Sequence, residues 1–209
     1  MECFVINRNK NILTMKKLSY LSMIVIAAFA FQGCSNETKD SKETADSLNE
    51  SKDTTTNTAA TGGIAVVEDD AEFATKAAVG GMAEVEFGKI ALTKSTNAKI
   101  KEFANMMVND HGKANGELKT LATAKNITLP SALDEDHVKI MNDLTALTGR
   151  DFDKKYVDVM VDGHKKTLDL MEKESKDGKD ADLKAFATKT APIVKAHGEM
   201  INKIKDSMK

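Results

Sequence analysis

The chain has 209 residues, a formal net charge of −2 and 41% hydrophobic residues, enough for one modest folded domain. It has two prolines, no tryptophan and two tyrosines, and it is rich in Ala, Leu, Met and Val, which favours helix over sheet. The sequence lacks a basic aromatic stripe, a Gly-rich phosphate loop and a Walker pattern, so no nucleic-acid partner is expected.

Residues 1–33 are predicted to be a signal peptide. A segment that starts at Met15 carries two lysines, continues as an apolar run to Phe31 and ends in Gly33-Cys34. The run is too short for an ordinary membrane-spanning helix, and a basic front end is typical of a secretory signal. Residues 1–14 make an unusual beginning for such a signal, and we interpret them as an upstream start-site extension.

Cys34 is the predicted lipidation site, because a small residue followed by cysteine resembles the lipobox of bacterial lipoproteins. Phe31-Gln32 departs from the usual lipobox, which has a leucine and a small residue there. Acyl chains on Cys34 would anchor the protein to a membrane. The expected location is therefore the bacterial cell envelope, at the outer membrane and facing the periplasm. The alternative is an uncleaved or simply secreted chain.

The stretch from 34 to 64 is predicted to be a linker that begins at the lipidated cysteine and is disordered. It consists of Ser, Thr, Asn, Lys, Asp and Glu with almost nothing apolar, so it cannot bury a core. The only other cysteine, Cys3, lies in the start extension. The folded part therefore has no thiol for a disulfide, a nucleophile or a metal ligand.

Residues 65–209 are predicted to form an all-α domain, a four-helix bundle. Apolar residues recur three to four positions apart along four long segments, and such faces bury against one another. An extra short helix stands between helices two and three, in a segment that could be a crossover or a cap. The predicted helices are 68–94, 96–126, 133–147, 150–176 and 180–208.

Three of the four histidines lie on these apolar faces, each near the middle of a different long helix: His111, His164 and His197. An imidazole in an apolar seam must find a partner or lose solvation energy. The fourth, His137, follows three acidic residues at the start of the short helix, and we expect it to be solvated.

Glu84 lies on the apolar face of the first long helix, about one layer away and roughly 9 Å from His111. Three imidazoles and one carboxylate would suit a divalent transition metal such as iron, zinc or copper. The alternative is a metal-free cluster in which the histidines pair with Glu84, Asn115, Thr190 or water. Asp110 could orient an imidazole, although we favour a solvated acid there.

Four segments carry a resemblance to a known family: "GGMAEVEFGKIAL", "KEFANMMVNDHGKANGELKTLA", "LTALTGRDFDKKYVDVMVDGHKKTLDLMEKE" and "LKAFATKTAPIVKAHGEM". Over about residues 70–200 the chain resembles a bacterial envelope family of the ferritin-like superfamily, domain of unknown function 4142, whose members are often labelled outer membrane proteins. The Asp-His pair, the Gly-x-x-Phe-Asp-x-x-Tyr run and the Pro-x-x-x-x-His run all match. The resemblance implies a ferritin-like four-helix bundle and no established activity.

The sequence differs from ferritins in the residues that would hold iron. Di-iron carboxylate bundles use Glu-x-x-His pairs on two helices. The positions three before the seam histidines are instead Val108, Val161 and Val194. This argues against a ferroxidase centre and leaves a mononuclear histidine-rich site or no metal.

The leading hypothesis is a lipid-anchored bundle that binds a metal through His111, His164, His197 and Glu84, with a role in metal handling or oxidative stress by analogy with the fold. The alternative is a non-catalytic structural or interaction lipoprotein without metal, whose protein partner the sequence does not identify. A redox enzyme that uses the same cluster with Tyr156 nearby is a third possibility, so enzymatic activity stays open.

Overall fold

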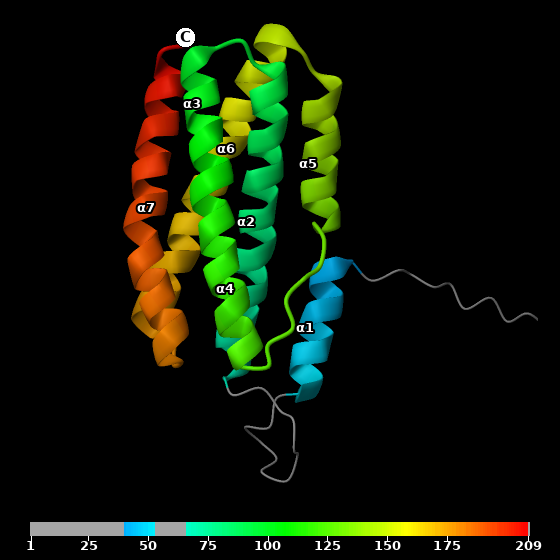
Figure 1. Ribbon diagram of the computed structural model, residues 1–209, viewed down its shortest axis with the longest axis vertical. Coiled ribbons are helices and arrows are strands. Elements are labelled where there is room, and N and C mark those ends of the chain that lie inside the picture. Colours follow the sequence, from blue (N-terminus) through cyan, green and yellow to red (C-terminus); the bar gives the residue numbers. More distant parts are fainter. Residues whose placement is uncertain (1–39, 53–65, 209) are drawn as a thin grey trace, which may run out of the picture. The chain divides into compact units, whose positions relative to one another are not determined.

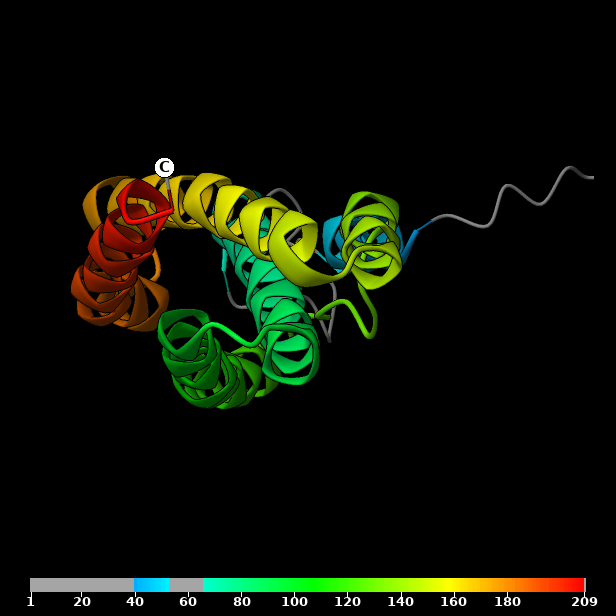
Figure 2. The same cartoon turned by 90° about the horizontal axis from the view of Figure 1, so that it is seen from above.

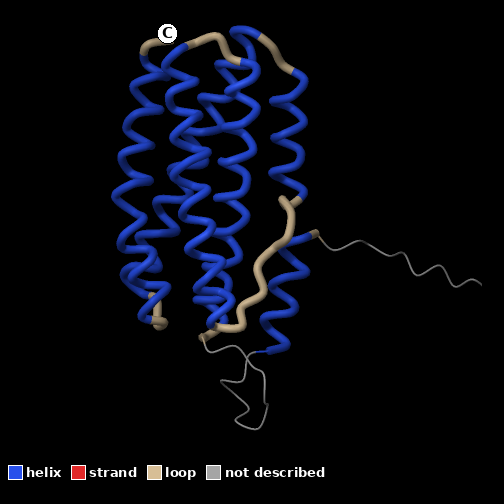
Figure 3. Tube along the Cα trace, in the orientation of Figure 1, coloured by secondary structure: helices blue, strands red, loops and turns tan. Residues whose placement is uncertain are grey.

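The computed structural model describes residues 40–52 and 66–208. The predicted signal peptide, the lipidation site Cys34 and the parts of the predicted linker before residue 40 and after residue 52 lie outside the described residues. Every regular element of the described part is helical, as predicted (Figures 1 and 3). In chain order the elements are α1 (Ser41–Lys52), α2 (Glu68–Lys94), α3 (Ala98–Met106), the π-helical turn η1 (Met107–His111), α4 (Gly112–Ala124), α5 (Glu135–Ala146), α6 (Gly149–Asp177) and α7 (Ala181–Asp206).

Four long arms form a helical bundle. The elements α3, η1 and α4 follow one another without a break and make one arm, and α2, α6 and α7 make the others. Seen from above, α2 packs on α6 and on the α3–α4 arm, and α7 packs on the same two neighbours, which closes the ring (Figure 2). None of the described helices is long and apolar enough to cross a membrane.

Short polar residues set where several of these helices begin. The Asn97 side chain accepts hydrogen bonds from the backbone N–H groups of Lys99 and Ile100 at the start of α3. Asp134 does the same for α5 and Asp180 for α7. Such caps satisfy the backbone donors that have no partner inside the first helical turn.

One connection between the long helices runs the length of the bundle. The turns after α2 and after α6 are short, so each of these helices is followed by an antiparallel neighbour. Residues 125–148 instead lead from the end of α4 to the opposite end of the bundle, where α6 begins (Figure 1). The segment that includes α5 is therefore a crossover, and α5 lies outside the ring against α2 and α6 (Figure 2).

The predicted disordered linker is wrong over Ser41–Lys52, which forms α1 and packs on α2. The Asn49 side chain exchanges two hydrogen bonds with the backbone of Thr128, at 2.9 and 2.7 Å. The Ser41 hydroxyl accepts hydrogen bonds from two further backbone N–H groups of the crossover, and Ala45 is buried. Polar contacts thus hold a helix whose composition offers little hydrophobic driving force.

The core consists of two apolar clusters, one on each side of a polar layer. On α6, His164 lies between Met160 of one cluster and Met171 of the other, and on α7 His197 lies between Ala187 and Ile201. On the α3–α4 arm His111 lies between Met107 and Leu118, and on α2 Glu84 follows Ala83 at the point where one cluster gives way to the other. The apolar clusters therefore hold Glu84, His111, His164 and His197 at a common height in the bundle.

Candidate metal centre

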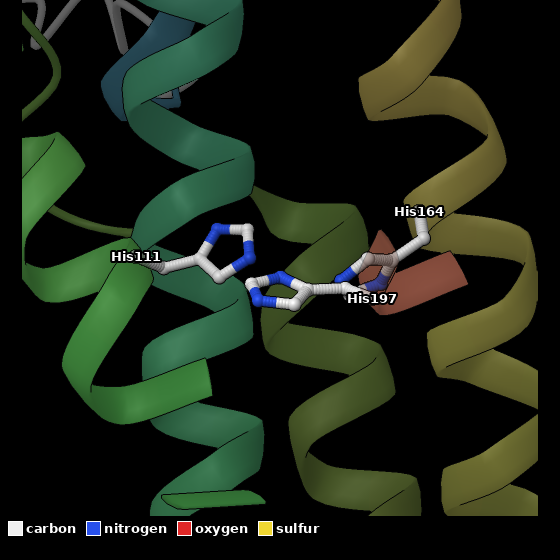
Figure 4. A group of neighbouring side chains, drawn as sticks. All are labelled: His111, His164 and His197. Carbon is white, nitrogen blue, oxygen red and sulfur yellow. The ribbon is translucent and has the colours of Figure 1, made fainter. Parts of the chain in front are cut away.

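Three histidines from three arms meet inside the bundle (Figure 4). One ligand atom from each of His111, His164 and His197 lies within 4.8 Å of the other two, and all three side chains are buried. The centroids of the rings are 5.5, 5.5 and 5.7 Å apart, so the rings form a nearly equilateral triangle. Side chains predicted to share a seam at similar heights are thus brought to one place.

Glu84 joins this cluster, and the expected separation of roughly 9 Å from His111 is wrong. Its Oε2 lies 2.7 Å from His111 Nδ1, and its Oε1 lies 3.4 Å from His164 Nδ1. The reason is that residues 95–97 belong to neither helix, so the levels of Glu84 and His111 are counted from two different helix ends. Counted from Lys94 and Ala98, Glu84 and His111 are ten and thirteen residues away, a difference that a glutamate side chain spans.

His111 is the last residue of the π-helical turn η1, Met107–His111. A π turn inserts one residue into an α-helix and is frequent at functional sites. On the same arm, Phe103 before the turn and Leu118 after it both face the core. The turn therefore lets both halves of the arm present apolar residues inward while His111 points at the other two imidazoles.

One ring nitrogen of each histidine faces an oxygen of the protein. His164 Nδ1 donates to the carbonyl oxygen of Met160 at 2.9 Å, and His197 Nε2 donates to Asp110 Oδ2 at 3.0 Å. Carbonyls and carboxylates only accept, so these two nitrogens carry the protons. His111 Nδ1 lies against Glu84.

The second nitrogen of each ring is buried and has no hydrogen-bond partner among the described residues. These atoms are His111 Nε2, His164 Nε2 and His197 Nδ1. Both oxygens of Glu84 also lack an aligned hydrogen bond, although they lie close to His111 and His164. Buried polar atoms are normally satisfied, so a group of five unsatisfied atoms in one place indicates a site for a ligand.

Glu84, His164 and His197 have the protonation that binds a cation, whereas His111 does not. Burial raises the pKa of Glu84, but the neighbouring charge of His111, and then of His164 and His197, lowers it below its usual value overall. Burial lowers the pKa of His164 and of His197, so both rings are neutral. For His111 burial acts in the same direction, but Glu84 outweighs it and the pKa is raised. An ionised carboxylate and neutral imidazoles are the forms that bind metals, so His111 would release its proton when an ion binds.

The structure corrects two other expectations about polar residues. Asp110 is 47% exposed but is not simply a solvated acid, because it holds His197 on a different helix. His137 is half-buried, pairs with Asp134 and packs against Phe87, with 6.3 Å between ring centroids. It does not join the cluster of the other three histidines.

Two aromatic residues lie near the cluster: Tyr156, which the sequence placed there, and Phe103, which it did not indicate. Phe103 packs on His164 and His197, with ring centroids 5.6 and 6.4 Å apart, and limits how these rings can turn. The Tyr156 hydroxyl is buried and has no hydrogen-bond partner among the described residues. Burial, followed by the charge of Glu84, raises its pKa, so it stays protonated. An aromatic residue on an apolar helix face carries no signal that distinguishes these roles from core packing.

Comparison with known proteins places the fold and the family. A crystal structure of a DUF305 fragment from Deinococcus radiodurans superposes with a TM-score of 0.60 at 7% identity, over 68% of this chain and 98% of that one, a likeness of fold alone. No curated protein matches the sequence. The family of the domain of unknown function DUF4142 matches residues 39–204. The chain belongs to the DUF4142 family.

Proposed function

We propose that this protein binds one divalent transition-metal ion through His111, His164 and His197, with Glu84 as a fourth ligand. The observation that carries the proposal is the set of unpartnered buried atoms, one nitrogen on each ring and both Glu84 oxygens. A bond to a cation satisfies the three ring nitrogens at once, and Glu84 joins them by turning from His111 Nδ1, 2.7 Å away, toward the ion. Imidazole nitrogens with one carboxylate suit zinc, copper or iron, and no cysteine stands among the described residues.

The same proposal includes a ferritin-like bundle. In support, α2 and α7 run in one direction and the α3–α4 arm and α6 in the other, with one long crossover between the pairs (Figure 1). Ferritin-like folds have one such crossover. Valines three positions before each histidine, namely Val108, Val161 and Val194, favour a single ion over a di-iron centre.

The biological role that we propose is metal handling or protection against oxidative stress in the bacterial envelope. A site with four protein ligands leaves little room for a substrate on the ion, which favours holding or passing on a metal over hydrolysis. The envelope location depends on acylation of Cys34. The helix α1 begins seven residues later, so an acylated chain would hold the bundle within about 25 Å of the lipid. Metabolic labelling with a fatty acid, in the wild type and Cys34→Ser, tests the anchor.

Titration with cobalt(II) tests the site, because its absorption bands report the ligands. We expect one equivalent to bind with the bands of a low-symmetry, four-coordinate ion. Replacing any of the three histidines with alanine should weaken binding by at least tenfold, and Glu84→Gln should change the bands. His137→Ala is the matched control and should bind like the wild type. Equal binding by all variants would contradict the proposed ligands, and no binding by the wild type would favour a metal-free structural lipoprotein.

A further inference from the structure

A groove of about 480 Å³ leads from the surface toward the candidate metal centre. It lies among α2, α5 and α6, with Lys42 of α1 also on its wall. Apolar side chains of the three helices form its sides, including Val79, Phe87 and Ile140. The groove is therefore bounded by the outer face of α2 and α6 and by the crossover helix.

Glu84 lines this groove and also contacts His111. Its side chain is 94% buried, and neither of its oxygens has an aligned hydrogen bond among the described residues. Gly163 lines the groove beside it, and a Cβ atom at this position would lie 3.7 Å from Glu84 Oε1. Gly163 has no side chain that would separate Glu84 from the groove, and none of His111, His164 and His197 lines the groove.

The charge around the groove is positive, apart from Glu84 itself. Four lysines line it, and only two other acidic residues do so, Asp134 and Asp162. Asp134 already caps α5 and pairs with His137. Lys42 and Lys76 pair with acidic neighbours, whereas Lys155 and Lys166 are exposed and have no ion-pair partner among the described residues.

We propose, on the basis of the metal site above, that this groove is the route to the ion and that it receives the metal as an anionic complex with a small polycarboxylate chelator. A hydrated dication is repelled by Lys155 and Lys166, whereas an anionic complex is attracted to them. The apolar walls accommodate the carbon skeleton of the chelator. Glu84 is then the first protein ligand that the ion meets, and the histidines take it over from the chelator.

Loading kinetics with cobalt(II) citrate and with aqueous cobalt(II) test this route in the full mature protein. We expect Lys155→Glu/Lys166→Glu to slow loading from cobalt citrate about tenfold at low ionic strength, with no slowing for aqueous cobalt and an unchanged final stoichiometry. Added salt should reduce the difference. The matched control is Lys154→Glu/Lys165→Glu, two exposed residues of the same helix outside the groove, which should load like the wild type.

Closing the groove gives a second, independent measurement. Gly163→Leu should slow loading from both forms of cobalt without changing the final stoichiometry, because its side chain covers Glu84. Gly116→Leu is the control, since its Cβ would meet nothing within 4 Å. Circular dichroism checks that both variants fold. If Gly163→Leu is misfolded, the loading rates of the lysine variants still test the proposed route.

The two proposals fail in different ways. If the wild type takes up no cobalt from either source, the metal site itself is wrong. If it takes up one equivalent but both lysine variants load cobalt citrate at the same rate, the site stands and the anionic route is wrong. Equal slowing for citrate-bound and aqueous cobalt in Lys155→Glu/Lys166→Glu would also overturn the choice of an anionic complex.

Discussion

In each imidazole of the cluster, one ring nitrogen contacts a protein oxygen, and the other has no hydrogen-bond partner among the described residues. For His197 the oxygen comes from Asp110, on a neighbouring arm, at 3.0 Å. An acceptor at Nε2 keeps the proton there and leaves the Nδ1 lone pair directed into the cluster. Asp110 thus acts on the candidate ion through His197 without touching it.

Asp110→Ala should therefore lower the affinity for cobalt(II) by about 10–100-fold while the free energy of unfolding of the metal-free protein stays close to that of the wild type. Competition with a chelator of known affinity measures this. Asp169→Ala, an exposed acid on α6, is the control. An unchanged affinity in Asp110→Ala would show that the contact to His197 is incidental.

Glu174 gives a residue-scale prediction that does not involve the metal. Its carboxyl is only 6% exposed, its Oε1 has no hydrogen-bond partner among the described residues, and burial, followed by Asp70 and Asp180, raises its pKa to about 7. A raised pKa means that the folded state holds the proton more tightly than the unfolded chain. The stability from this group is complete below pH 4.5 and is lost as the pH rises toward 7.

Glu174→Gln should remove the loss of stability that Glu174 causes as the pH rises. We expect the variant to gain about 1 kcal/mol of unfolding free energy relative to the wild type between pH 5 and pH 8. Urea unfolding of the metal-free proteins at both pH values gives the comparison. A constant difference between variant and wild type across this range would rule out the raised pKa.

At the scale of elements, the π-helical turn Met107–His111 decides where one of the histidines points. Deleting the exposed residue Asn109 should remove the inserted residue, so that the arm becomes regular α-helix with α3 and α4 still in register and the backbone around His111 shifts only locally. We expect the variant to stay helical by circular dichroism but to bind cobalt more weakly, because the local shift moves the His111 ring relative to the other two imidazoles. Asn109→Ala keeps the length of the arm and should bind normally. Unchanged binding in the deletion would mean that the turn does not position His111.

Helix periodicity predicted the long arms well, and their bounds differ from the structure by a few residues at most. It also placed His111, His164 and His197 at one height, because apolar spacing determines which side chains face the core. Helix periodicity did not predict features that depend on contacts between distant residues or on a local irregularity of a helix. The π turn has no sequence signature, the pairing of Asp110 with His197 joins two arms, and α1 depends on polar contacts between Asn49 and the crossover.

At the scale of the whole molecule, two apolar clusters enclose one polar layer, and this layer contains most of the buried histidine and carboxylate atoms without partners. Buried polar groups of this kind lower stability unless something satisfies them. A bound ion would therefore stabilise the bundle as well as occupy it. The groove beside α5 gives this layer its connection to the surface.

Elemental analysis of the protein purified from its native source without a histidine tag tests this account most directly. We expect close to one equivalent of a single transition metal per chain, and none in the variant with His111, His164 and His197 all replaced by alanine. Absence of a stoichiometric metal from the folded wild type, together with its failure to take up added zinc, copper or iron, would contradict the account.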